Sequence, residues 1–323
     1  MIRGLITVEA LAATLIASAA AAAGPPVLHF SVFADTGLRL TDVAWTGSRF
    51  LYVENTTNKV FAAGPSGLPL RPFAPMPQEV EETRCCVSRG GHGFSAGGVY
   101  CHSPSNKIYR ISPDGGTVTL FATLPESAIS DGALAFDTGG RFGYALLAAT
   151  GQSGSEATDG GTVYAVDGRG NVRTVGSYAG PGGADEIAVA SIRFGTAAHD
   201  VLLTVDAGAR GGRLAAMDGR GHSRTLVTLP DGPNPIVTIG RHTGRRPAAP
   251  PGLYVADTAT HNVFFAPAAD FERFIGDVVV GSEIMGAFWI VRPRGRGFEA
   301  VRLSTMLQGT AFNLEGATYI PPR

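Results

Sequence analysis

The sequence carries little charge and almost no lysine. Charged residues make up 16% of its 323 residues, and Lys59 and Lys107 are the only lysines beside 24 arginines. The formal net charge of −1 excludes a general electrostatic attraction to nucleic acid or to an anionic membrane. Arginine in place of lysine, with much Ala and Gly, is typical of a GC-rich bacterial genome.

The familiar zinc-binding sequence motifs are also absent. There is no Cys-x-x-Cys pair and no His-Glu-x-x-His helix, which excludes the zinc sites that these motifs build. No helix of ordinary length stands out. The 44 glycines and 21 prolines instead punctuate short apolar runs, a pattern that indicates strands joined by turns.

One long apolar run stands at the N-terminus. Arg3 precedes an apolar stretch over residues 5–23, and Ala21 to Ala23 form a small-residue cleavage site. We interpret residues 1–23 as an export signal and residues 24–323 as a single domain, secreted or periplasmic and without a stable membrane span after cleavage. Glu9 interrupts the run and leaves two alternatives, a translation start near Val8 or a segment retained as an anchor.

A short strand–turn–strand phrase recurs along the rest of the chain. Residues 252–265 read Gly-Leu-Tyr-Val-Ala-Asp-Thr-Ala-Thr-His-Asn-Val-Phe-Phe, which is an apolar run, a polar turn and a second apolar run. The first apolar residues of the second strands recur about every 50 residues, a period typical of propeller blades. These anchors are Val60, Ile108, Val163, Leu214 and Val263.

The stretch Tyr254-Val255-Ala256-Asp257-Thr258 with His261-Asn262 resembles the NHL repeat. The repeat pattern also resembles the wider group of six-bladed propellers that contains the senescence-marker, gluconolactonase and strictosidine-synthase-like proteins. The resemblance implies an all-β, six-bladed β-propeller. It implies little about activity, because this fold hosts many functions.

The chain contains six candidate outer strands, and the first of them precedes any complete unit. We therefore expect a ring closed by the N-terminus, in which residues 28–34 form the outer strand of a blade whose other strands lie near 284–291, 297–303 and 315–320. The candidate outer strands are residues 31–34, 71–74, 119–122, 176–179, 226–228 and 278–280.

A polar residue stands before the innermost strand of each expected blade. Because innermost strands line the central channel, we expect these side chains to converge at its mouth. Carboxylate and amide oxygens suit a hard divalent cation, Ca²⁺ above all. The expected ligands are Asp42, Asp131, Asp185, Glu186, Asn234, Glu283 and Glu315.

Several alternatives to this metal site stay open. Glu315 either begins a third strand or opens an innermost strand itself, and each acidic residue also suits an ordinary turn. The resembling lactonases hold their metal with a Glu, two Asn and an Asp. Here a second Asn is missing, and Thr83-Arg84 puts a cation where one blade would contribute a ligand.

Two functions from different classes follow. In the first, which we favour, a metal-dependent hydrolase opens a small lactone or ester, with Asp131 or Glu186 as general base. In the second, the propeller binds a small molecule, a glycan or a protein on the same face without catalysis. His102, Asp257 and His261 fall in loops on that face, where histidines are more often surface residues than ligands.

The cysteines are few and lie close together. Cys85 and Cys86 precede a turn with Gly93 at its midpoint, and Cys101 follows it. In an antiparallel hairpin this midpoint places Cys85 opposite Cys101, within reach of a disulfide. A slip of one residue would offer Cys86 instead; a Cys85–Cys86 bond and three buried thiols are the remaining alternatives.

Overall fold

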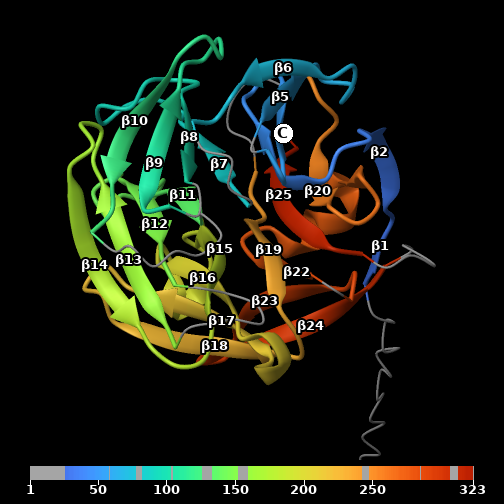
Figure 1. Cartoon of the computed structure of the whole chain (residues 1–323). Coiled ribbons are helices and arrows are strands. Elements are labelled where there is room, and N and C mark those ends of the chain that lie inside the picture. Colours follow the sequence, from blue (N-terminus) through green and yellow to red (C-terminus); the bar gives the residue numbers. More distant parts are fainter. Residues whose placement is uncertain are drawn as a thin grey trace, which may run out of the picture.

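The computed structural model describes residues 26–57, 59–77, 82–102, 105–125, 133–151, 159–241, 247–283, 285–305 and 312–322. Within them the chain forms six small sheets arranged in a ring (Figure 1). The fold is therefore an all-β, six-bladed β-propeller, as the repeat period predicts. No helix among the described residues is long and apolar enough to cross a membrane.

The first four blades follow one another along the chain, each with its strands in sequence order from the channel outward. Blade 1 is β3 (Leu40–Trp45), β4 (Phe50–Glu54), β5 (Val60–Ala63) and β6 (Arg71–Ala74). Blade 2 is β7 (Arg84–Val87), β8 (Val99–His102), β9 (Lys107–Ile111) and β10 (Val118–Thr123). Blade 3 is β11 (Leu134–Phe136), β12 (Leu146–Ala149), β13 (Gly161–Val166) and β14 (Val172–Tyr178). Blade 4 is β15 (Gly183–Val189), β16 (Val201–Asp206), β17 (Gly212–Met217) and β18 (Ser223–Leu229).

The last two blades are interlocked. Blade 5 starts with β19 (Pro233–Thr238), but the chain then enters blade 6 and forms β20 (Gly252–Asp257) and β21 (Asn262–Pro267). It returns through the 3-10 helix η4 (Ala268–Phe274) to complete blade 5 with β22 (Val278–Ser282), β23 (Phe288–Arg294) and β24 (Gly297–Thr305). Blade 6 receives its innermost strand last, as β25 (Leu314–Ile320).

The N-terminal strand closes the ring. β2 (Ser31–Asp35) is the outer strand of blade 6 and pairs with β21, while β1 (Val27–Leu28) adds a parallel strand to β24 of blade 5. The predicted closure is thus confirmed, but two of the three partner strands are wrong. The stretch 278–280 is a second strand and not an outer one, and residues 288–294 and 297–305 belong to blade 5.

Each pair of neighbouring blades shares one hydrophobic cluster. Successive side chains of a strand point to opposite faces of its sheet, so Leu202 and Leu203 of β16 enter different clusters, one against blade 5 and one against blade 3. Inner strands are consequently apolar on both faces, and all residues of β16 are buried. The outer strands are half exposed, as the pattern of β14 shows.

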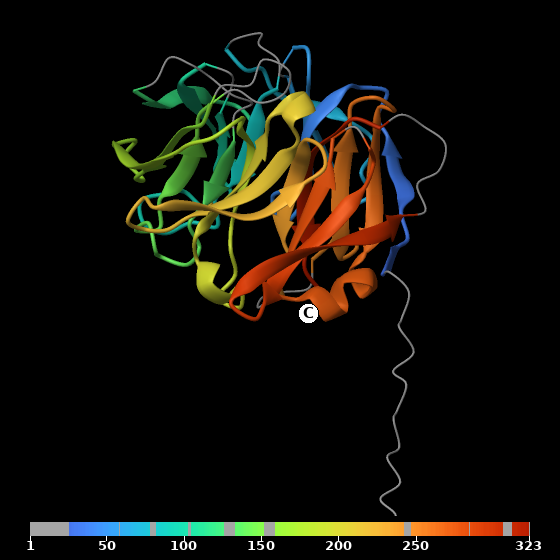
Figure 2. The same cartoon turned by 90° about the horizontal axis from the view of Figure 1, so that it is seen from below.

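The two faces of the disc differ in what they carry. All innermost strands start on one face, which we call the start face, and finish on the other, the end face. Figure 2 shows the disc from the side, with η4 and η2 (Gly195–Ala197) on the end face and η3 (Gly208–Arg210) on the start face.

The predicted hairpin register in blade 2 is confirmed. Cys85 of β7 lies opposite Cys101 of β8, with their Cα atoms 4.1 Å apart, and the two form a disulfide. Cys86 lies opposite Tyr100 and is a free thiol.

Candidate functional site

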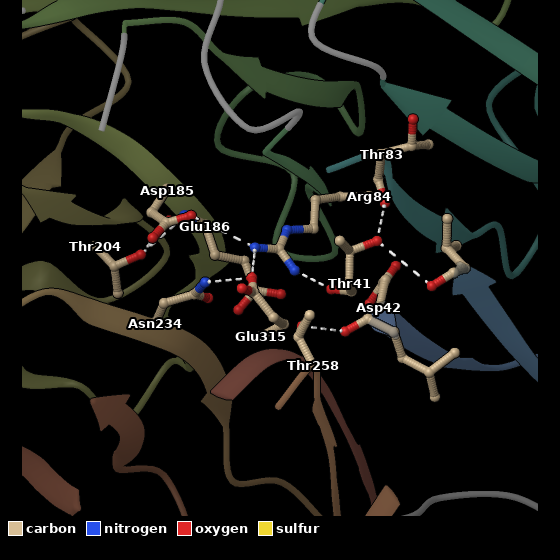
Figure 3. A network of polar contacts seen from close by, with 12 residues as sticks. Thr41, Asp42, Thr83, Arg84, Asp185, Glu186, Thr204, Asn234, Thr258 and Glu315 are labelled. Carbon is tan, nitrogen blue, oxygen red and sulfur yellow. Dashed lines mark hydrogen bonds and ion pairs between the residues drawn. The ribbon is translucent and has the colours of Figure 1, made fainter. Parts of the chain in front are cut away.

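Polar side chains from five innermost strands converge near the start face (Figure 3). They come from the first four residues of β3, β7, β15, β19 and β25. These strands surround the channel in that circular order, with β11 between β7 and β15. Every member is at most 8% exposed. The set, which we call the polar layer, is Asp42, Arg84, Asp185, Glu186, Asn234 and Glu315.

Arg84 lies at the centre of the polar layer. Its Nη2 donates to Glu315 Oε2 at 2.7 Å and lies 3.5 Å from Asp185 Oδ1, and its Nη1 donates to the Thr41 carbonyl. These contacts join blade 2 to blades 1, 4 and 6. A buried guanidinium therefore stands where the sequence predicts a metal ion.

Backbone and amide donors hold the carboxylates in place. The Cys85 amide donates to Asp42 Oδ2 at 2.7 Å, and the Ile236 amide donates to Glu186 Oε2 at 2.6 Å. Asn234 Nδ2 donates to the Glu315 oxygen that Arg84 also contacts, at 3.1 Å. Each of these bonds crosses from one blade to the next, so the polar layer connects neighbouring blades around the channel.

Burial shifts the protonation equilibria of these groups. Desolvation raises the pKa of Glu186 to about 8 and that of Asp42 to about 6, although the Arg84 charge lowers both. For Arg84 itself burial lowers the pKa, but Glu315 and Asp185 outweigh it and leave the pKa well above its usual value. At neutral pH, Glu186 is thus mostly a neutral acid and Arg84 is always charged.

A cavity of about 770 Å³ extends from the polar layer along the channel. Asp42, Arg84 and Glu186 line one end, and the exposed residues Gly47 and Arg89, beyond the last residues of β3 and β7, line the other. Between them the lining is mixed. It includes the apolar or aromatic residues Trp45, Leu134, Ile187, Ile236 and Tyr319 and the polar residues Thr46, Ser88 and Thr318. The cavity therefore reaches the surface at the end face and terminates on buried acids.

A second acidic group lies beside the polar layer. Asp185, Asp206 and Glu283 each bring one carboxylate oxygen within 4.8 Å of the others. Asp206 ends β16, and its Oδ1 accepts the Gly208 amide at 2.7 Å. Sequence reasoning named Asp185 and Glu283 but missed Asp206, because Asp206 is the last residue of a second strand and does not precede an innermost one.

The structure separates the predicted ligands into three groups. Asp42, Asp185, Glu186 and Asn234 begin innermost strands as expected, and Glu315 opens innermost strand β25, which settles its open alternative. Glu283 was wrongly placed, because it follows β22 in a second-to-third strand connection. Asp131 lies outside the described residues.

Two of the three predicted loop residues, His102 and Asp257, lie at the ends of strands and are buried, so the prediction of loop positions is wrong for them. Asp257 is fully buried and holds its turn, accepting from the Thr260 amide at 3.0 Å and the Asn313 amide at 2.7 Å. His102 ends β8, is 1% exposed and lies opposite Arg84. His261 adopts a positive φ of 62° in the β20–β21 turn, where its carbonyl accepts from Thr36.

The role of Arg84 is the main feature that ligand reasoning missed. The signal was present, since Thr83-Arg84 stands directly before an apolar strand like the acidic residues of the other blades. If the residues before all innermost strands are treated as one ring, whatever their charge, the sequence places one cationic side chain among several acidic ones.

Comparisons with known proteins support the fold class. No protein-family model matches the chain, and no curated protein matches it. Among solved structures, it is similar to a chain of "Crystal structure of Nidogen/Laminin Complex", with a TM-score of 0.57, 8% identity, and coverage of 87% of this chain and 84% of that chain. A chain of "YCF48 bound to D1 peptide" matches with a TM-score of 0.44 and 10% identity, over 81% of this chain and 66% of that one. The first likeness shows a shared β-propeller fold.

Proposed function

We propose that this chain is an exported six-bladed propeller that binds a small molecule in its central channel. The observation that carries the proposal is the cavity of about 770 Å³ with a mixed polar and apolar lining and a charged inner end. Small-molecule sites typically measure roughly 300–1,000 Å³, and this cavity falls within that range. Membership of the NHL and senescence-marker group is part of the proposal, supported by residues 254–262 and the six blades.

The disulfide supports export. Disulfides persist in oxidising compartments and are rare in the cytosol, and Cys85 and Cys101 are joined. Sequencing the N-terminus of the protein recovered from the periplasm or medium tests this point. A mature N-terminus at Gly24 agrees with the proposed signal, whereas recovery only from the cytosol contradicts it.

Ligand binding is tested by narrowing the channel. Ala317 lies on β25 in the cavity wall and is only partly buried, so Ala317→Phe fills space without removing a polar contact. A fragment screen by saturation-transfer NMR should find compounds that bind wild type and lose binding in the variant. Ala62→Phe on β5, outside the cavity lining and also partly buried, is the control. Compounds that bind wild type and Ala317→Phe equally well would show that binding occurs outside the channel.

Hydrolysis is the second candidate, and Glu186 favours it. A buried carboxyl whose pKa is raised to about 8 at the end of a cavity is a typical candidate for acid–base catalysis. As a general base it must be ionised, so turnover should rise with pH through about 8. An ester and lactone panel with wild type and Glu186→Gln tests this, and equal rates in both exclude Glu186 as the base.

We also propose a binding site for a divalent cation, formed by a different set of residues from the set that the sequence predicts. The polar layer does not fit a metal ion, because the Arg84 guanidinium already stands among its carboxylates. Asp185, Asp206 and Glu283 do fit a hard cation in donor type and spacing. A bound Ca²⁺ would stabilise the folded state by linkage, so Ca²⁺ should raise the Tm of wild type and not of Asp206→Asn.

A further inference from the structure

We propose that the end face of the propeller docks on an anionic phospholipid surface. This inference concerns the outer surface of the protein and goes beyond the proposed function. The first observation is charge. Among the described residues, the connections on the end face carry eight exposed arginines and three exposed acidic residues. Six of these arginines have no ion-pair partner and no ring contact in the described part of the chain: Arg89, Arg169, Arg193, Arg220, Arg241 and Arg296.

The turns that carry these arginines are held by other groups. In blades 3 and 4 the turns between the third and outer strands both read Asp-Gly-Arg-Gly. Asp167 accepts from the backbone amide of Arg169 at 2.8 Å. Asp218 accepts from the backbone amide of Arg220 at the same distance of 2.8 Å. The aspartates fix the turns, so both guanidinium groups are left for an external anion.

Turns of neighbouring blades pack closely enough to form one surface. A Cβ atom on Gly168 of blade 3 would lie 2.5 Å from the backbone of Gly93 of blade 2. A Cβ atom on Gly219 of blade 4 would lie 2.9 Å from the side chain of Arg141 of blade 3. Glycine is needed at both contacts because the turns touch. The arginines of blades 2 to 4 therefore lie on one continuous surface.

An apolar side chain stands among these arginines. Ile192 is 74% exposed, the highest value of any large apolar residue in the described part of the chain. Ser191 fixes the turn around it, since its Oγ accepts from the Arg193 amide at 3.0 Å and donates to the Gly276 carbonyl at 2.9 Å. The turn thus holds Ile192 in solvent beside a cation. Buried apolar area and attraction to anionic lipid are the two contributions to interfacial membrane binding.

A second aromatic element joins blades 2 and 3 on the same face. The ring of Tyr144, which is 43% exposed, stacks on the ring of His92 with their centroids 3.9 Å apart. Both residues adopt a positive φ, 60° for Tyr144 and 52° for His92, which is uncommon for residues other than glycine. Tyrosine suits the boundary between lipid and water, because its ring is apolar and its hydroxyl is polar.

The end face can attract an anionic surface although the whole chain has a net charge of −1. The carboxylates of the polar layer lie near the start face. A strand of six residues such as β16 separates the two faces by roughly 20 Å, whereas the Debye length at physiological salt is about 8 Å. A membrane at the end face therefore interacts with the arginines, and salt screens it from the polar layer.

A phospholipid surface fits both kinds of group on this face. Its phosphates accept hydrogen bonds from guanidinium groups, and its acyl layer takes up the side chain of Ile192. A soluble polyanion would engage the arginines alone. Docking through this face also turns the mouth of the channel cavity, beside Arg89, toward the lipid.

Vesicle co-sedimentation of the untagged exported protein tests the inference. Wild type should bind vesicles with about 30% phosphatidylglycerol in phosphatidylcholine at least about tenfold more tightly than pure phosphatidylcholine vesicles. This preference should disappear at about 500 mM NaCl, because salt screens the attraction. The triple variant Arg169→Gln, Arg193→Gln, Arg220→Gln should bind the anionic vesicles roughly 100-fold more weakly, since each basic residue near the surface contributes about fivefold.

A matched triple variant controls for the loss of charge. Arg39→Gln, Lys59→Gln, Arg302→Gln removes three exposed cations that lie outside the end-face connections, and should bind the anionic vesicles as wild type does. An equal loss of binding in the two triple variants, or no preference of wild type for the anionic vesicles, would overturn the inference.

Ile192→Ser separates a membrane from a soluble polyanion. The variant should bind anionic vesicles about tenfold more weakly, because the exposed side chain no longer enters the acyl layer. Leu120→Ser, on outer strand β10 and 54% exposed, should bind them as wild type does. Equal vesicle binding by wild type and Ile192→Ser would overturn the inference, and tight binding to dextran sulfate would then identify a soluble polyanion as the partner.

The outcomes also separate this inference from the proposed function. Ala317→Phe narrows the channel and should bind vesicles as wild type does. Weaker vesicle binding by Ala317→Phe would show that lipid enters the channel, which overturns docking through the outer surface. Loss of vesicle binding leaves the fragment screen unaffected, so either proposal can fail while the other stands.

Discussion

Glu186→Gln should stabilise the protein, and increasingly so as the pH rises. Burial raises the pKa of Glu186 from 4.5 to about 8 in the folded state. When the pKa of a carboxyl is higher in the folded state than in the unfolded state, its contribution to the free energy of unfolding is complete only below the unfolded-state pKa. That contribution is lost as the pH rises through the folded-state pKa. Between pH 4.5 and about 8, wild type therefore loses stability that the glutamine variant keeps.

The expected size follows from the shift. A rise from 4.5 to about 8 corresponds to about 5 kcal/mol above pH 8 and about 3 kcal/mol at pH 7. The glutamine oxygen can still accept the Ile236 amide, which Glu186 accepts at 2.6 Å. At pH 4, where the carboxyl is neutral in both states, the two proteins should differ by less than about 1 kcal/mol.

Urea unfolding at pH 4, 7 and 9, with the disulfide intact, measures this dependence. Glu272→Gln, which changes an exposed carboxylate in η4, is the matched control and should follow the wild-type curve. A free-energy difference between wild type and Glu186→Gln that is the same at all three pH values would refute the reasoning, because it would show that Glu186 keeps an ordinary pKa.

Three further predictions concern the same framework. Arg84→Met leaves the surrounding buried carboxylates without their cation and should cost ~3–5 kcal/mol at pH 7 in urea unfolding; a loss as large at pH 4, where most carboxylates are protonated, would contradict this. Alkylation of the unreduced protein should label Cys86 alone by mass spectrometry, and reduction should cost at most ~3 kcal/mol, so three labelled cysteines would exclude the disulfide. Asp200, fully buried, contacts Arg141 of blade 3 at 3.0 Å and Arg224 of blade 4 at 3.2 Å, so Asp200→Asn should cost ~1–3 kcal/mol. Asp159→Asn, which removes an exposed pair, should change stability by less than ~1 kcal/mol, and a similar loss in both variants would contradict a special role for Asp200.

The local elements could be predicted from the sequence because their signals are local. The five anchors at Val60, Ile108, Val163, Leu214 and Val263 all lie in third strands of blades, since each belongs to a hairpin whose apolar runs and turn are contiguous. The pairing of Cys85 with Cys101 follows likewise from the midpoint of a glycine-rich turn. Hairpin register depends on turn geometry and on alternation, and both are written in neighbouring residues.

The assignment of strands to the last two blades could not be predicted in this way. The hairpin of β20 and β21 has the same local pattern whichever sheet it joins, and only the tertiary structure shows that it pairs with β25 and β2. Because β25 is the innermost strand of blade 6, Glu315, and not Glu283, is the first polar residue of an innermost strand. The period of the repeat indicates that a blade-like unit exists, but it does not indicate which strands from neighbouring units complete that blade.

The sequence by itself determined a ring of six blades with a polar residue at the start of each innermost strand. Tertiary structure alone decided what those residues do, because it brings Arg84 of blade 2 between Glu315 of blade 6 and Asp185 of blade 4. A guanidinium buried among carboxylates offsets part of their charge, and burial raises the pKa of Glu186. Both effects depend on distances between residues far apart in the chain, which the order of amino acids along one strand does not specify.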